Sequence, residues 1–319
     1  MNKKDTHGTG HIIQSLIVNL LIACSKGVAA FMTGSGAMLA ETIHSFSDCA
    51  NQALLLLGVK QSRRSPNEKH PLGYGRAVYF WSFMVAMLLF SVGGMFSIYE
   101  GIHKYNNPEK VDHIEWGIGV LLFSLILEGY ATYSNVVELN IRKSSAGFWQ
   151  YLRSTKDSDL VVIFGENSAA VLGLILAIAA LLASYYTGDG HYDGMGSFAI
   201  GVVLILVAIF LSIEVKSLLI GESADPVIND LVQKQVDKNP EILKLINCIT
   251  IQQGPGEVLI CMKIKCIHEL NALQISTLIN KFEQEIRTAA PEVKWIYIEP
   301  DLQEWKGQVE PQGRYDARN

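Results

Sequence analysis

The sequence contains six apolar runs, each long enough to form a helix that crosses a membrane. About 20 helical residues span the ~30 Å of hydrocarbon in a bilayer. Runs of this kind cover residues 11–33, 37–59, 78–102, 114–136, 160–185 and 195–220. Of the 319 residues, only 18% are charged, whereas soluble domains average about 25%. We therefore expect an α-helical membrane protein with six transmembrane helices.

The connections between these runs differ in their content of Lys and Arg, which collect in the cytoplasmic loops of membrane proteins. Residues 33–36 and 187–193 contain neither, whereas the connections after the second and the fourth run are rich in both. Those positive residues are Lys60, Arg63, Arg64, Lys69, Arg76, Arg142, Lys143, Arg153 and Lys156. With an even number of spans, this pattern predicts that both termini lie in the cytoplasm.

The first ten residues are polar, and the apolar run that follows them is longer than the core of a signal peptide. We expect residues 1–10 to form a cytoplasmic N-terminus without a cleaved leader. Because they do not have the character of a transit peptide, we expect an integral membrane protein of the bacterial plasma membrane.

The composition changes after Gly221, where the predicted transmembrane domain of residues 11–221 ends. Residues 222–302 alternate like a small soluble domain, with a helix, two strands around Gly-Pro-Gly, a second helix and a last strand. This αββαβ unit is near the lower size limit for an independent core, so self-association is a reasonable supplement. Residues 303–319 are polar, and we expect a flexible tail.

Several functions find no support in the composition or the motifs. The formal charge of -5 argues against nucleic-acid binding, which depends on clustered Lys and Arg. The five cysteines contain no C-x-x-C pair. Walker-type, H-E-x-x-H and G-x-S-x-G motifs are absent from the sequence as well. We therefore expect a protein that is not an enzyme and does not use ATP.

Three of the predicted spans contain ionisable residues that could belong to a functional site. The second span contains Glu41, His44 and Asp48, which fall on one face of a helix because successive residues rotate by about 100°. Glu128 lies in the fourth span and Glu166 in the fifth. Such residues are costly in a bilayer and normally face a cavity or a partner. They are the candidates for a functional site.

His44 and Asp48 are four residues apart, so both can reach one ion from a single helix. Glu166 from a facing helix would give one nitrogen and two carboxylates, a set that suits zinc or another first-row divalent ion. The alternative is that His44 and Asp48 only hydrogen-bond each other. Glu41 could instead lie at the interface or in a water-filled vestibule, and Glu128 could make a structural hydrogen bond or lie behind the ligands.

Four segments carry a resemblance to a known family. HSFSD with ANQ in the second span, HPLGYGRAVYFW entering the third, ENSAAVLG in the fifth and the αββαβ unit resemble the cation diffusion facilitators, or zinc transporters. The likeness runs from about residue 10 to 300, and it is strongest to the branch that includes the ninth mammalian zinc transporter. It implies export of a divalent metal in exchange for protons, by a homodimer whose cytoplasmic domains are ferredoxin-like.

Carried over residue by residue, the resemblance implies a transport site made of His44, Asp48 and two positions of the fifth span. These two positions are Glu166 and Ala170, and the family usually has Asp at the second. Three protein ligands therefore remain. A water molecule, Asn167 or Glu41 could complete the coordination.

The loop before the third span retains His70, but Tyr74 stands where a second histidine often occurs in the family. His70 is therefore only an auxiliary candidate for metal binding. At the cytoplasmic mouth of the third span, we expect Arg76 to pair with Glu222 or Glu214.

These observations predict a secondary transporter that exports Zn²⁺ from the cytoplasm by alternating access. If Asp48 and Glu166 each take a proton when the metal leaves, the exchange is two protons for one ion. The alternatives are a transporter of Mn²⁺, Fe²⁺ or Co²⁺, and a membrane metal sensor or scaffold that does not transport.

Overall fold

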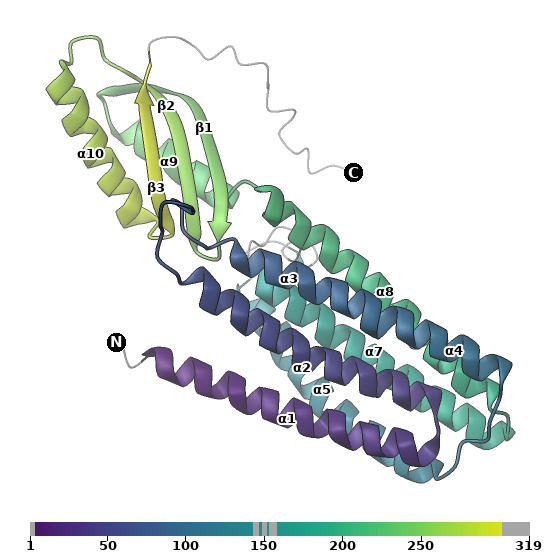
Figure 1. The fold of residues 1–319 in the computed structure, drawn as a ribbon. Coiled ribbons are helices and arrows are strands. Elements are labelled where there is room, and N and C mark those ends of the chain that lie inside the picture. The colour runs from purple at the N-terminus through teal and green to yellow at the C-terminus, as the bar shows by residue number, and fades with distance from the viewer. Residues whose placement is uncertain (1–3, 143–146, 149–151, 153–157, 302–319) are drawn as a thin grey trace. The chain divides into compact units, whose positions relative to one another are not determined.

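The computed structural model describes residues 4–142, 147–148, 152 and 158–301. The chain divides into two compact units, one up to Ile220 and one from Gly221 onward (Figure 1). The first unit is helical, and the second contains a small sheet. The predicted tail of residues 303–319 lies outside the described residues, as do Lys143, Arg153 and Lys156.

Long helices build the first unit, and each runs in the opposite direction to the long helix that follows it in the chain (Figure 1). One of them is composite, because α3 (Ala77–Leu88) continues through a π-helix (Leu89–Met95) into α4 (Phe96–Asn106). The other helices are α1 (Lys4–Thr33), α2 (Gly36–Ser62), α5 (Ile114–Arg142), α7 (Ser158–Thr187) and α8 (His191–Ile220). Each of the six predicted runs therefore lies within a helical stretch of this unit.

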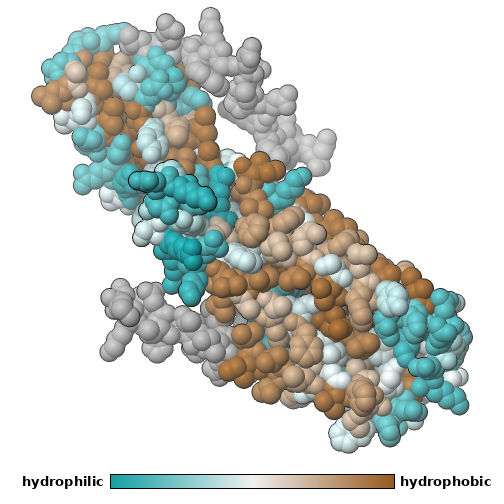
Figure 2. Space-filling view, in the orientation of Figure 1, coloured by the Kyte–Doolittle hydropathy of each residue, from teal (hydrophilic) through white to brown (hydrophobic). Residues whose placement is uncertain are grey.

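Length and hydropathy identify fewer clear membrane spans than the six that we expected. Within the described residues they identify four, Ala77–Asn106, Ile114–Ile141, Val161–Thr187 and His191–Ile220. In α1 the apolar helical segment identified among the described residues is short and covers Asn19–Thr33. In α2 the polar residues that suggested a site also lower the hydropathy. Figure 2 shows the apolar surface of these helices, with hydrophilic side chains gathered around residues 63–76 and at the end of α4.

α1 begins earlier than we expected. Its first residue is Lys4, within the segment of residues 1–10 that was predicted to precede the first span. A polar segment can continue a helix beyond the apolar part, because the backbone hydrogen bonds of the helix do not depend on burial.

Glycines allow α4 and α8 to approach closely, as small residues do between helices in membranes. A Cβ atom placed on Gly101 would lie 2.7 Å from the Cα of Phe198, and one placed on Gly201 would lie 2.7 Å from the backbone nitrogen of Ile98. Both distances are shorter than a normal contact between side chain and backbone. Any larger residue at these positions would separate the two helices.

The second unit has the expected order of elements, which are α9 (Pro226–Lys238), β1 (Ile242–Gly254), β2 (Glu257–Cys266), α10 (Ala272–Ala289) and β3 (Val293–Pro300). The sheet order is β1-β2-β3, with β1 antiparallel and β3 parallel to β2. Both helices contribute to the core on one face of the sheet, through residues such as Ile228 and Phe282. The opposite face has no helix of the described unit packed on it (Figure 1).

Candidate functional site

α2 positions most of the polar residues that the sequence singled out. The helix begins with Ser35 as its N-cap, whose hydroxyl accepts a hydrogen bond from the backbone nitrogen of Met38. Asp193 in the first turn of α8 also receives hydrogen bonds from the backbone nitrogens of Gly36 (2.5 Å) and Ala37 (3.2 Å). These contacts fix the start of α2 against α8 and thereby the rotation of its polar face.

His44 and Asp48 lie one turn apart on this face. The His44 side chain is fully buried, and its Nδ1 atom is 3.5 Å from Oδ1 of Asp48. This distance is at the limit of a hydrogen bond, and neither ring nitrogen of His44 has a hydrogen-bond partner among the described residues. The same holds for Oδ1 of Asp48. The alternative that these residues form only a hydrogen-bonded packing pair is therefore poorly matched by their geometry.

Glu166 lies on α7, which packs against α2. Its Oε1 atom accepts a hydrogen bond of 2.6 Å from the side-chain nitrogen of Asn51, one turn beyond Asp48 on α2. Glu166 is buried as well. The side chains of His44, Asp48 and Glu166 thus occupy the two helices on which the sequence placed them.

These residues do not form a completed metal-binding cluster. No group of three or more His, Cys, Asp or Glu side chains among the described residues is close enough to hold an ion. His44 and Asp48 lie on the side of α2 near α7, where Asn51 contacts Glu166, and buried polar atoms of His44 and Asp48 there have no hydrogen-bond partner among the described residues. Such atoms are rare in folded proteins and require an explanation.

Glu41 and Glu128 have a partner that the sequence analysis missed. The ammonium of Lys26 on α1 lies 3.2 Å from Oε2 of Glu41 and 2.9 Å from Oε1 of Glu128. The sequence offered one signal, because Lys26 is the single charged residue between residues 16 and 33. An isolated lysine within an apolar helix is costly unless it is paired.

The remaining sequence-predicted residues lie elsewhere. Asn167 is on α7, where its backbone carbonyl oxygen accepts a hydrogen bond from Thr132 of α5. Ala170, the position where an acid was missing, is buried one turn after Glu166. His70 is in an exposed loop, with its ring 4.4 Å from that of Tyr74. The pairing of Arg76 with Glu222 or Glu214 stays a prediction.

The second unit offers little for metal binding. Burial raises the pKa of the Cys248 thiol to about 11, so at neutral pH it remains protonated and is a poor ligand. Cys261 faces the other side of the sheet, as its alternation in β2 predicts.

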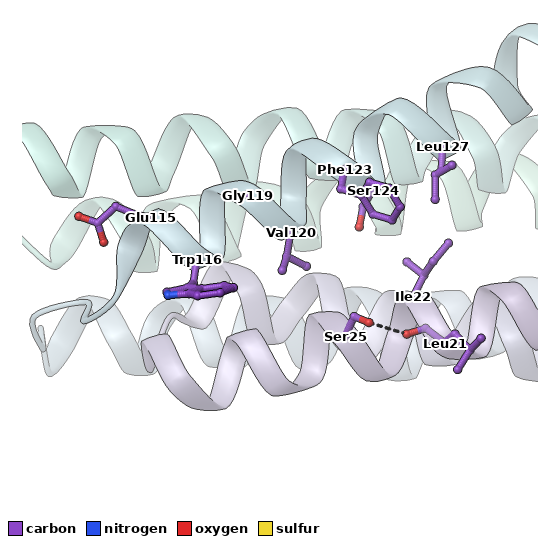
Figure 3. A pocket seen from close by; sticks show the side chains of 10 residues that line it. All are labelled: Leu21, Ile22, Ser25, Glu115, Trp116, Gly119, Val120, Phe123, Ser124 and Leu127. Atoms are coloured by element: carbon purple, nitrogen blue, oxygen red, sulfur yellow. Dashed lines mark hydrogen bonds between the residues drawn. The ribbon is translucent and has the colours of Figure 1, made fainter.

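A cavity of about 600 Å³ lies between α1 and α5. Figure 3 shows Trp116, Phe123 and Leu127 of α5 on one side of it and Ile22 of α1 on the other. Ser25 turns back to donate a hydrogen bond to the carbonyl oxygen of Leu21 (Figure 3). The walls are mainly apolar, so this cavity is distinct from the polar face of α2.

Comparison with known proteins places this arrangement in a family. Residues 12–220 match the family model described as the cation efflux transmembrane domain. The chain belongs to the cation efflux family. This confirms the resemblance that the sequence motifs indicated, and it identifies the first unit as an integral membrane domain.

Individual relatives agree with this assignment. The chain is 31% identical over 254 residues to human "Proton-coupled zinc antiporter SLC30A9, mitochondrial", covering 79% of this chain and 45% of the relative. It is 30% identical to "Metal tolerance protein C4" of Arabidopsis thaliana, covering 79% and 56%. It is 23% identical to "Zinc transporter ZitB" of Pectobacterium atrosepticum, covering 72% and 68%. The chain thus spans about half the length of the human and plant relatives.

Proposed function

We propose that this chain is a secondary transporter that exports Zn²⁺ from the cytoplasm in exchange for protons. One observation carries the proposal. Buried nitrogen and oxygen atoms of His44 and Asp48, without hydrogen-bond partners in the described part of the chain, lie on the helix that contacts Glu166. In a family of cation efflux proteins, the transported ion is the simplest partner for them.

The ligand chemistry supports a first-row divalent ion. His44 supplies an imidazole nitrogen, and Asp48 and Glu166 supply carboxylate oxygens, a combination that zinc accepts in open sites. Two carboxylates neutralise one divalent cation, which lowers the cost of holding the ion inside a membrane. Asn51 would orient Glu166 through its hydrogen bond of 2.6 Å. Glu41, the other candidate from the sequence, is paired with Lys26, so Asn167 or a water molecule would complete the coordination in place of the acid missing at Ala170.

Alternating access requires that the ion leave and that another charge replace it. Protons are suited to this, because the carboxylates of Asp48 and Glu166 can bind them when the metal has gone. One proton on each carboxylate would keep the charge of the empty and the loaded site equal. The printed name of the human relative describes a proton-coupled zinc antiporter, which supports the same exchange here.

We further propose that all six long helices cross the membrane, with both termini in the cytoplasm. The polar face of α2 would be tolerated in the bilayer because it is directed at other helices. The Lys and Arg residues after the second and fourth spans support this orientation. Arg76 would then pair with Glu222 or Glu214 at the cytoplasmic side. The bacterial plasma membrane stays a prediction, since the relatives include a mitochondrial and a bacterial protein.

The second unit is proposed to be a ferredoxin-like domain that pairs with its copy in a homodimer. Its helices cover one face of the sheet, and the other face carries an apolar row of Ile249, Cys261 and Tyr297 across three strands. Ile249 and Tyr297 are half exposed. A unit of this size gains stability by covering such a face, and a second copy of the chain is the proposed occupant.

The variant Tyr297→Glu is expected to lower the dimer fraction of the detergent-solubilised full chain, since two charges would meet near a twofold axis. Size-exclusion chromatography with light scattering measures this fraction. The matched control is Leu273→Glu, an equally drastic change at an exposed position of α10. If the Tyr297→Glu chain is as dimeric as the wild type, the proposed interface is wrong.

Metal flux into sealed vesicles tests the proposed function against its alternatives. Purified protein in proteoliposomes that contain a zinc-sensitive dye should give saturable zinc uptake, and excess Mn²⁺, Fe²⁺ or Co²⁺ should compete weakly. Stronger uptake of one of these ions would change the assigned substrate. Metal binding without flux would identify a sensor or scaffold.

A further inference from the structure

Lys26 is a fully buried cation in the first unit. Its Nζ atom is 2.8 Å from Oγ of Ser45, 2.9 Å from Oε1 of Glu128 and 3.2 Å from Oε2 of Glu41. Each of the three N–H groups of the ammonium therefore has an oxygen acceptor. Through these bonds α1 is joined to α2 and α5.

This group of side chains adjoins the proposed ion site. Ser45 follows His44 directly, and Glu41 precedes it by one turn. With about 100° of rotation per residue, Glu41 and Ser45 lie on one side of the polar face of α2, and Asn51 lies on the other. His44 and Asp48 fall between them. α2 therefore contributes to two neighbouring groups of polar side chains. One is the proposed ion site with Glu166 of α7, and the other surrounds the Lys26 ammonium.

The oxygen atoms around the ammonium resemble those that hold hard metal ions. Two carboxylates and a hydroxyl converge on one point, and Mg²⁺, Mn²⁺ and Ca²⁺ prefer oxygen ligands of this kind. Oε1 of Glu41 and Oε2 of Glu128 are buried and have no hydrogen-bond partner among the residues described. They would be available to an ion at that point. Without the lysine, the two carboxylates would carry the charge that balances one divalent cation.

Packing holds the Glu41 carboxylate in this position. A Cβ atom placed on Gly173 of α7 would collide with Oε1 of Glu41. α7 therefore lies directly against Oε1 of the Glu41 carboxylate, while Oε2 accepts a hydrogen bond from Lys26. The close approach of α7 limits movement of Glu41 away from the ammonium.

We propose that Lys26 is a built-in cation that fills this oxygen-lined centre and excludes a second metal ion from it. The lysine thereby determines that the helical unit carries one metal ion at a time. The limit of one metal ion during transport rests on the proposed function. The occupation of the centre by Lys26 does not, because it can be tested without transport. Lys26 is a specificity-determining residue in this account and does not contact the transported ion.

The test measures Mn²⁺ binding to full-length chains that carry Asp48→Ala, which removes a ligand of the proposed transport site. In this background, Lys26→Ala is expected to create a site for one Mn²⁺ ion per chain, detected by electron paramagnetic resonance. Saturating Mn²⁺ should raise the unfolding temperature of this variant by at least about 5 °C. The reference chain, with Lys26 retained, should show neither effect.

Two controls separate this role from a purely structural one. Lys26→Arg keeps the positive charge, and it should prevent Mn²⁺ binding. Adding Glu41→Gln and Glu128→Gln to the Lys26→Ala chain removes the carboxylates, and the new site should disappear. A folded Lys26→Ala chain that binds no Mn²⁺ would overturn the proposal.

If Lys26→Ala does not fold in metal-free buffer, its recovery is compared with and without Mn²⁺ during purification. Recovery that depends on Mn²⁺ supports the built-in cation. Recovery that depends only on removing both carboxylates, and not on Mn²⁺, contradicts it. If the wild type shows no zinc flux, the proposed function is wrong. This result would not alter the outcome of the Mn²⁺ experiment.

Discussion

Replacing Asp48 with alanine is expected to abolish saturable zinc transport. The substitution removes one of the two carboxylates that would balance the charge of the ion. It leaves the ion with only two of the proposed protein ligands, His44 and Glu166. Loss of an outer partner of a metal ligand costs 10- to 100-fold in affinity, so loss of a direct ligand should weaken zinc binding by roughly 100-fold or more. Dye-based flux in proteoliposomes and equilibrium binding of zinc measure the two effects.

Zinc transport should fall most in His44→Ala and Glu166→Ala, and less in Asn51→Ala. The first two remove ligands, whereas Asn51→Ala removes only the hydrogen bond to Glu166 and should retain part of the transport. Glu109→Ala is the matched control, because this carboxylate is exposed and pairs with Lys104 outside the polar face of α2. Normal transport by a folded Asp48→Ala chain would show that the assignment of the site is wrong.

An imposed pH gradient is expected to drive zinc accumulation in proteoliposomes. When the lumen is one pH unit more acidic than the outside, protons that leave the vesicle would drive zinc into it. An exchange of two protons for one ion allows the zinc concentration inside to reach about 100 times that outside at equilibrium. The physical reason is charge, since the carboxylates of Asp48 and Glu166 would hold either one divalent ion or two protons. Zinc and proton fluxes measured together give the ratio.

The electrical response separates two versions of this coupling. Equal charge on the loaded and the protonated site predicts little effect of a potassium-valinomycin potential near neutral pH. A strong effect would reject the count of two protons and leave coupling intact. Zinc uptake that ignores the pH gradient would rule out proton exchange altogether.

Hydropathy was sufficient to locate the helices, because a long apolar run in a membrane protein has few alternatives to a helix. The sheet unit was also predictable in outline, since β2 and β3 match the alternating segments of residues 257–266 and 293–300. The π-helix at Leu89–Met95 was not foreseen. It interrupts an apolar run whose composition gives no sign of it, and its Gly93 and Gly94 pack on α8.

The candidate site was predictable only in part. The positions of His44 and Asp48 on one helical face follow from their spacing, whereas their relation to Glu166 depends on the packing of α2 and α7. The ion pairs of Lys26 could not be derived, because its partners lie 15 and 102 residues further along the chain. Such pairings depend on the rotation and register of three helices, which sequence periodicity does not determine.

The central claim is that the transported ion binds to His44, Asp48 and Glu166. X-ray absorption at the zinc edge of the zinc-loaded full chain tests it most directly. The account predicts nitrogen and oxygen ligands at about 2.0–2.2 Å, no sulfur at about 2.3 Å, and loss of the imidazole signal in His44→Ala. A sulfur shell, or an unchanged imidazole signal in the His44→Ala chain, would contradict it.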